Sequence, residues 1–124
     1  VIATDKAPAA VGAYSQAIKA NGMVFVSGQL GLVPGTKDFA GESVAAQTKQ
    51  ALENMAAILE AAGTDMAHVV KTTVLLADIA TFGEMNEVYG TFFASEPPAR
   101  AAFAVKDLPL GGVVEIEAVA VLPE

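Results

Sequence analysis

The sequence predicts an α+β domain in which two helices cover one face of a β-sheet. Segments typical of strands and helices follow one another in the order two strands, helix, strand, helix, two strands. The 124 residues contain no linker, repeat or low-complexity segment, which indicates a single domain with its own core. Hydrophobic residues make up 53% of the chain, and so apolar a composition indicates surface buried against another subunit.

A β-hairpin opens the predicted fold. The Asn21-Gly22 dipeptide favours the positive φ angles of a tight turn, and strand-forming residues flank it within residues 12–31. Residues 32–41 carry the proline, glycine and aspartate of a loop. We therefore expect two short antiparallel strands followed by a loop.

A helix is predicted over residues 44–62, with Ser43 as its N-cap and Gly63 as its stop. Apolar side chains at helical spacing form one face of it: Leu52, Met55, Leu59 and Ala62. We expect this face to cover the sheet.

The second half of the chain alternates strand and helix. Residues 68–78 are rich in β-branched side chains and form a strand. Asp78 can cap a second helix over residues 79–95, which must end before the two prolines that follow. Residues 100–105 and 113–122 form two further strands.

The composition excludes several kinds of site. Seven basic residues, spread along the chain, are outnumbered by 14 acidic ones, and the net charge of −7 argues against a nucleic-acid partner. The absence of cysteine excludes disulfides, thiolate metal sites and a cysteine nucleophile. His68 is the only histidine, so we expect no multi-histidine metal site and an ordinary strand-end role for this residue.

Location is constrained only loosely. No apolar run approaches the roughly 20 residues of a membrane span, and no secretory signal is visible. We expect a cytoplasmic protein, which the lack of cysteine fits. Because the chain starts at Val1, a plastid or mitochondrial location after removal of a transit peptide is the alternative.

Two carboxylates lie on the last predicted strand. Alternation places Val114 and Ile116 on one face, and Glu115 and Glu117 on the other together with three valines. One interpretation is a solvated face that carries two acids. The other is a face buried against a second subunit, where a glutamate has a raised pKa and can carry a proton.

Arg100 is the only arginine, although six lysines serve elsewhere. It follows two prolines at the start of a predicted strand. A planar guanidinium holds a carboxylate through two parallel hydrogen bonds, whereas lysine offers a point charge. Arg100 is therefore either the structural partner of a glutamate or a clamp for the carboxylate or phosphate of a ligand.

Four further residues have two interpretations each. Asn86 interrupts an apolar and aromatic stripe on the second helix, so its amide is either bonded to backbone or faces a ligand pocket. Ser27 and Gly28 either end a strand or bring backbone N–H groups close to an anion. Tyr14 is either a half-buried strand aromatic or a ligand contact.

The chain resembles the RidA family, the YjgF-type imine deaminases, from about residue 2 to residue 122. Six blocks carry the resemblance in order: GAYSQAI, VFVSGQLG, QTKQALENMAAILEAAG, VVKTTVLLADIATFGEMNEVYGTFF, PPARAAFAV and VEIEAVAV. The sequence departs from the family pattern at Ala13, where the family commonly has proline, and at Gly111-Gly112, where the family often has charged residues.

The resemblance implies a chorismate-mutase-like fold, with a six-stranded mixed sheet and two helices on one face, assembled as a homotrimer with sites between subunits. It also implies hydrolysis of 2-imino acids such as 2-iminobutanoate and 2-iminopropanoate, or their enamines, to 2-keto acids and ammonia. Pyridoxal-phosphate enzymes such as threonine dehydratase release these compounds. The deaminase itself needs no cofactor and no metal.

Residue roles also follow from the resemblance. Arg100 matches a clamp for the substrate carboxylate, and Glu115 matches the group that activates water. The backbone carbonyl of Ala102 matches a contact to the imine nitrogen. Four residues match the pocket that binds the ligand: Tyr14, Ser27, Gly28 and Asn86.

Two alternative functions remain open. A trimer of this kind could bind 2-keto acids or amino acids without catalysis and regulate a partner enzyme. The apolar composition also leaves a chaperone-like role open, although burial between subunits would use the same surface.

Overall fold

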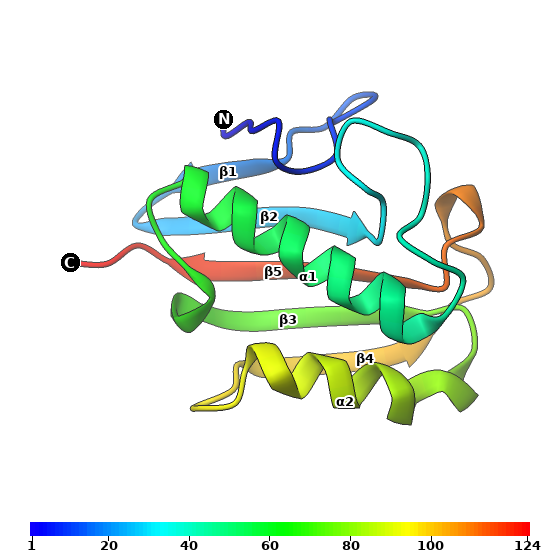
Figure 1. Ribbon diagram of the computed structural model, residues 1–124. Coiled ribbons are helices and arrows are strands. Elements are labelled where there is room, and N and C mark those ends of the chain that lie inside the picture. The colour runs from blue at the N-terminus through cyan, green and yellow to red at the C-terminus, as the bar shows by residue number, and fades with distance from the viewer.

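The computed structural model describes residues 1–124 and contains a mixed five-stranded sheet. The strands are β1 (Ala17–Ala20), β2 (Met23–Leu30), β3 (Val69–Leu76), β4 (Ala99–Ala104) and β5 (Val114–Val121). They lie in the order β1-β2-β5-β3-β4 (Figure 1), with β3 and β4 parallel and the other neighbours antiparallel. The α+β class is confirmed, but the expected six-stranded sheet is wrong. The segment before β1 makes only a single bridge, between Ile2 and Ala17, which is too short to form a strand.

Two helices cover one face of this sheet (Figure 1), α1 (Val44–Ala61) and α2 (Phe82–Phe92). The predicted cap of α1 is confirmed, because the Ser43 hydroxyl oxygen accepts a hydrogen bond from the Ala46 N–H at 3.0 Å. Gly63 ends the helix with a φ of 89°.

The second helix is shorter than predicted. Asp78 caps a 3₁₀ turn, η2 (Ile79–Thr81), and α2 then ends at Phe92. The following residues cannot continue the helix, because Glu96 has a φ of 49° and precedes a proline. Two other 3₁₀ turns precede strands: η1 (Met66–His68) and η3 (Pro109–Gly111).

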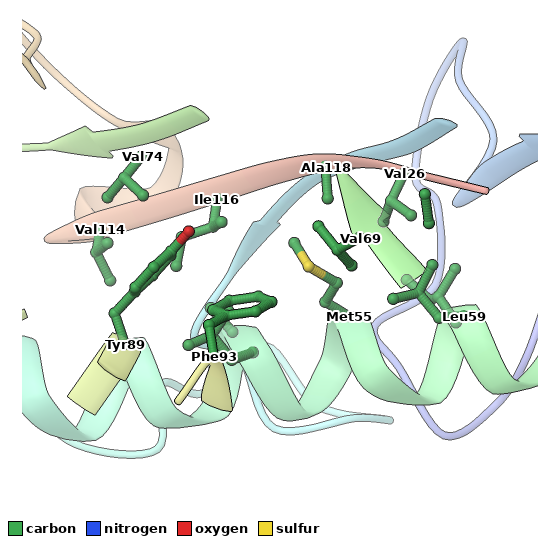
Figure 2. Close-up of a cluster of buried hydrophobic side chains, with 14 of the residues drawn as sticks. Val26, Met55, Leu59, Val69, Val74, Tyr89, Phe93, Val114, Ile116 and Ala118 are labelled. Carbon is green, nitrogen blue, oxygen red and sulfur yellow. The ribbon is translucent and has the colours of Figure 1, made fainter. Parts of the chain in front are cut away.

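The core lies between the helices and the sheet. Figure 2 shows side chains of the two helices, such as Met55 and Tyr89, directed toward strand side chains such as Ile116 and Ala118. The predicted apolar face of α1 is fully buried there. None of the helices meets the length and hydropathy that crossing a membrane requires.

The opposite face of the sheet has no helix on it, and several large apolar side chains are exposed there. Ile18, Phe25 and Phe103 project from β1, β2 and β4 with 40–48% of their surface exposed. A sheet normally buries such a face against another layer. This surface agrees with the apolar composition noted in the sequence.

Candidate functional site

A cavity of about 640 Å³ lies where the N-terminal loop, the end of β2 and the start of β5 come together. These segments meet at one end of the sheet (Figure 1). Four of the predicted site residues line it: Tyr14, Ser27, Gly28 and Glu115. The cavity is of the size that holds a small organic ligand.

Glu115 is the central ionisable group of this cavity. It lies on β5 in register with Leu30 and Leu75 and is half-buried. Burial raises the pKa of its carboxyl group, and the negative charge of Glu117 raises it further. A carboxylate with a raised pKa is a better proton acceptor near neutral pH. Glu117 is itself exposed, so the two acids predicted on one face differ in environment.

Gly28 makes room for the Glu115 side chain. A Cβ atom at position 28 would lie 2.9 Å from Glu115 Cδ, closer than real Cβ contacts allow, and 3.1 Å from Oε2. A β-bulge between Val26 and Gln29 inserts one extra residue at this point of β2. Bulges of this kind redirect side chains beside functional sites. The space left by the missing side chain of Gly28 is therefore filled by the Glu115 side chain of the same chain.

Ser27 has a fixed hydroxyl group. Its Oγ donates a hydrogen bond of 2.6 Å to the Ser15 carbonyl, and its backbone N–H donates to the Gln16 carbonyl at 3.0 Å. Because the hydroxyl proton is already used, the oxygen of Ser27 can only accept a hydrogen bond from a ligand in this arrangement.

Arg100 belongs to a second group of residues, outside the cavity. Its Nη1 donates a 2.7 Å hydrogen bond to Asn86 Oδ1, and its guanidinium carbon lies 4.7 Å from the Tyr89 ring centroid and 5.3 Å from that of Phe82. No carboxylate of the same chain lies within 4 Å of it, so Arg100 forms no structural ion pair within the chain. The rings and the amide fix its orientation while leaving most of its five donors free.

Asn86 differs from its prediction in one respect. Of its two interpretations, the bond to backbone is not found: the side chain is exposed, and its Oδ1 accepts the hydrogen bond from Arg100. Tyr89 on the same helix is buried and shares a 2.7 Å hydrogen bond with the Thr72 hydroxyl. Burial raises the pKa of Tyr89, against the opposing effects of Thr72 and of the Arg100 charge.

The two groups lie on opposite faces of the sheet. Arg100 is in register with the buried Thr72 of β3 and contacts helix α2, which places it on the helix side. Glu115 is in register with Leu75 and alternates with the buried Val114 and Ile116, which places it on the open side. Ala102, two residues after Arg100, packs partly buried against the core. One chain therefore does not bring the predicted residues into a single site.

The cavity also holds residues that the sequence analysis did not single out. Gln16 is buried, and its amide bonds four backbone groups of the loop before it, including the Thr4 N–H at 2.7 Å and the Pro8 carbonyl at 2.7 Å. This loop forms one wall of the cavity. The sequence offered no periodic signal for Gln16, only a polar residue in the GAYSQ block.

His68 is not part of either group. Its Nδ1 lies 2.7 Å from Asp65 Oδ1 in an exposed pair at the start of β3, as expected of a strand-end residue. The hydrogen bond to His68 lowers the pKa of the Asp65 carboxyl group.

A family model described as Endoribonuclease L-PSP matches residues 4–122. Reactive Intermediate Deaminase A, chloroplastic, of Arabidopsis thaliana is 54% identical over 98% of this chain, which spans 65% of that protein's length. The 2-iminobutanoate/2-iminopropanoate deaminases of rat and human are 54% and 52% identical over 98% of this chain and 88% of theirs.

Solved structures of similar sequence have the same fold. RidA from an Antarctic Psychrobacter species superposes with a TM-score of 0.93 at 50% identity, covering 98% of both chains. Escherichia coli TdcF with bound serine superposes with a TM-score of 0.94 at 38% identity, covering 99% of this chain and 98% of the other. The chain therefore belongs to the YjgF/RidA family that the Endoribonuclease L-PSP model describes.

Proposed function

We propose that this protein hydrolyses reactive 2-imino acids, such as 2-iminobutanoate and 2-iminopropanoate, and their enamine tautomers, to 2-keto acids and ammonia. The observation that carries the proposal is the half-buried Glu115 carboxylate, whose pKa is raised inside a cavity of suitable size. Relatives at 52–54% identity over nearly the whole chain are named 2-iminobutanoate/2-iminopropanoate deaminase.

The complete site would form between two copies of the chain. The cavity is lined by two carboxyl groups and by no basic side chain, so by itself it repels the carboxylate of an imino acid. Arg100, on the other face of the sheet, has free donors and no acidic partner. A homotrimer in which the β4 edge of one copy lies against the open sheet face of the next would bring Arg100 and Asn86 of the first copy to the cavity of the second. The exposed apolar residues of that face support such packing.

In this arrangement each residue has a defined task. Arg100 holds the substrate carboxylate, and the backbone carbonyl of Ala102 accepts a hydrogen bond from the imine N–H. Strand β4 lies at the edge of the sheet, so one row of its carbonyl groups has no strand partner within the chain. Tyr14, Ser27 and Gly28 shape the wall against which Glu115 lies.

The reaction proceeds in two steps. Glu115 takes a proton from water as the water oxygen bonds to the imine carbon, and the C=N electron pair moves to nitrogen, which receives the proton. Glu115 then takes the hydroxyl proton of the carbinolamine and passes it to the nitrogen. The C–N bond breaks, and ammonia and the keto acid are released. Positioning together with one general base gives roughly 10²–10⁴-fold from proton transfer, which suits a substrate that already hydrolyses in water. The steps transfer no electrons to a carrier, so they require no cofactor.

We further propose that pyridoxal-phosphate enzymes such as threonine dehydratase supply the substrate, as the family resemblance implies. We place this activity in the cytoplasm, with a plastid or mitochondrion as the alternative. The chloroplast relative supports that alternative.

Two other functions are weaker candidates. A protein that only binds keto or amino acids, as the serine in the TdcF structure suggests for that protein, needs the arginine but not the glutamate. An endoribonuclease, the activity in the family model's description, would need cationic groups for the phosphate backbone. The net charge of −7 and the two acids of the cavity oppose such a substrate.

A coupled assay tests the proposal. A dehydratase converts L-threonine in the presence of semicarbazide, which traps the free imine as an ultraviolet-absorbing semicarbazone, and the protein or its Arg100→Ala variant is added. Suppression of semicarbazone formation by the wild type alone supports imine hydrolysis with Arg100 as the clamp. If neither protein suppresses it, the function is binding and the deaminase proposal fails.

A further inference from the structure

Leu110 has an unusual backbone conformation for a leucine. It lies in the turn η3 between β4 and β5 with a φ of 59° and a ψ of 15°. This left-handed region suits glycine or asparagine, and a leucine there is strained. Gly111 follows with a φ of 76°, so two successive residues are left-handed.

The neighbouring residues hold the turn in this shape. The Gly112 N–H donates to the Pro109 carbonyl at 3.1 Å, and the Val113 N–H donates to Oε1 of the buried Gln47 at 3.0 Å. A Cβ at Gly112 would lie 2.9 Å from Leu30, so the backbone is pressed against β2. The strained conformation is therefore fixed by the fold rather than by packing of the Leu110 side chain.

The Leu110 side chain is nevertheless placed in the cavity wall. It is 68% exposed, yet it lines the same cavity as Glu115. Val11, 78% exposed, lines the cavity from the N-terminal loop. Residues with a strained backbone cluster at functional sites. Burying an alkyl group of a ligand against these two exposed apolar side chains would be favourable.

We propose that Leu110, together with Val11, contacts the side chain of the bound 2-imino acid and sets a preference for longer alkyl groups. The inference rests on the proposed function. The cavity of about 640 Å³ leaves most of its space empty around a methyl-bearing substrate. A branched alkyl side chain would reach the apolar wall that Leu110 and Val11 provide.

The test compares two substrates on the same enzyme. An amino-acid oxidase generates the imines of alanine and leucine in separate reactions, catalase removes peroxide, and semicarbazide trapping reports the free imine. Leu110→Asn removes the apolar group and relieves the strain, because asparagine tolerates the left-handed region. Leu110→Met restores an apolar side chain. Ile79→Asn is the matched control, since Ile79 is 56% exposed and outside the cavity.

We expect Leu110→Asn to lower kcat/KM about tenfold for the leucine imine and less than twofold for the alanine imine, the low end of what one alkyl contact gives in a pocket. Its melting temperature should not fall. Leu110→Met should keep the wild-type ratio of the two substrates within about threefold, and Ile79→Asn should not change it.

Three outcomes overturn the inference. An unchanged substrate ratio in Leu110→Asn, with an active wild type, refutes it and leaves the deaminase proposal standing. An equal loss on both substrates with a smaller particle in light scattering would show that Leu110 contacts another copy. A wild type inactive on both imines would remove the proposed function, and this inference with it.

Discussion

Gly28 offers a direct test of whether the position of the Glu115 carboxylate matters. In Gly28→Ala the new methyl carbon would lie 2.9 Å from Glu115 Cδ, against an ordinary contact distance of roughly 3.5–4.0 Å. The carboxylate must therefore shift by roughly 0.5–1 Å. A misplacement of about 1 Å lowers the rate on the order of 10²-fold, which is the loss we expect in kcat. The backbone of residue 28 is not left-handed and the residue is exposed, so the fold should tolerate alanine.

The assay is semicarbazone suppression in the dehydratase-coupled reaction, with melting temperature recorded alongside. Gly83→Ala is the control, because a Cβ there meets no atom within 4 Å and the residue lies in α2. It should keep full activity and stabilise the protein by about 0.5–1 kcal/mol, the usual gain of alanine over glycine in a helix. Full activity in Gly28→Ala would refute the role of Glu115 as a positioned base. Lost activity with a lowered melting temperature would make Gly28 structural.

The remaining predictions concern Arg100 and Glu115. Arg100→Lys should lose most activity, roughly 10²-fold or more, with little change in melting temperature, because it keeps the charge but not the two-pronged grip; full activity would exclude the clamp. Glu115→Gln should bind keto acids but not turn over imines, and wild-type kcat/KM should fall on acidification through the raised pKa of Glu115. The raised pKa means that ionised Glu115 destabilises the folded state at pH values above the unfolded pKa of about 4.3. Glu115→Gln should therefore raise the melting temperature at pH 7 but not near pH 3.5, where the carboxyl group is protonated in both states. Equal shifts at both pH values would contradict this. Mixing Arg100→Ala with Glu115→Gln after unfolding and refolding together should restore about a quarter of wild-type activity by random assembly if each site takes one residue from each of two copies; no recovery would place both residues of a site in the same chain.

Local signals in the sequence predicted most elements of the fold. The Asn21-Gly22 turn has φ angles of 52° and 74°, as a tight hairpin requires. The caps of α1 and its buried face depend on residues within one helix, so spacing was sufficient. The end of α2 was placed three residues too late, because the backbone leaves the helical region at Phe93 and turns left-handed at Glu96 before the prolines.

The parts of the site that could not be predicted depend on pairing between distant segments. The face of Glu115 followed from alternation along β5, but the face of Arg100 depends on its register with Thr72, which the sequence does not state. Gln16 bonds backbone groups, whose positions no residue pattern encodes. The sequence around Leu110 indicates a turn, but glycine rather than leucine would be expected at a left-handed position.

The arrangement of charge supports the proposal that Arg100 binds a ligand carboxylate. Arg100 has no acidic partner within the chain; its contacts are an amide oxygen and two ring faces, which lysine would use poorly. The cavity, in turn, contains the carboxyl groups of Glu115 and Glu117 but no basic side chain. The two halves lie on opposite faces of one sheet and cannot meet in a monomer. If one carboxylate ligand is held by Arg100 while it faces Glu115, as we propose, its site requires a second copy of the chain.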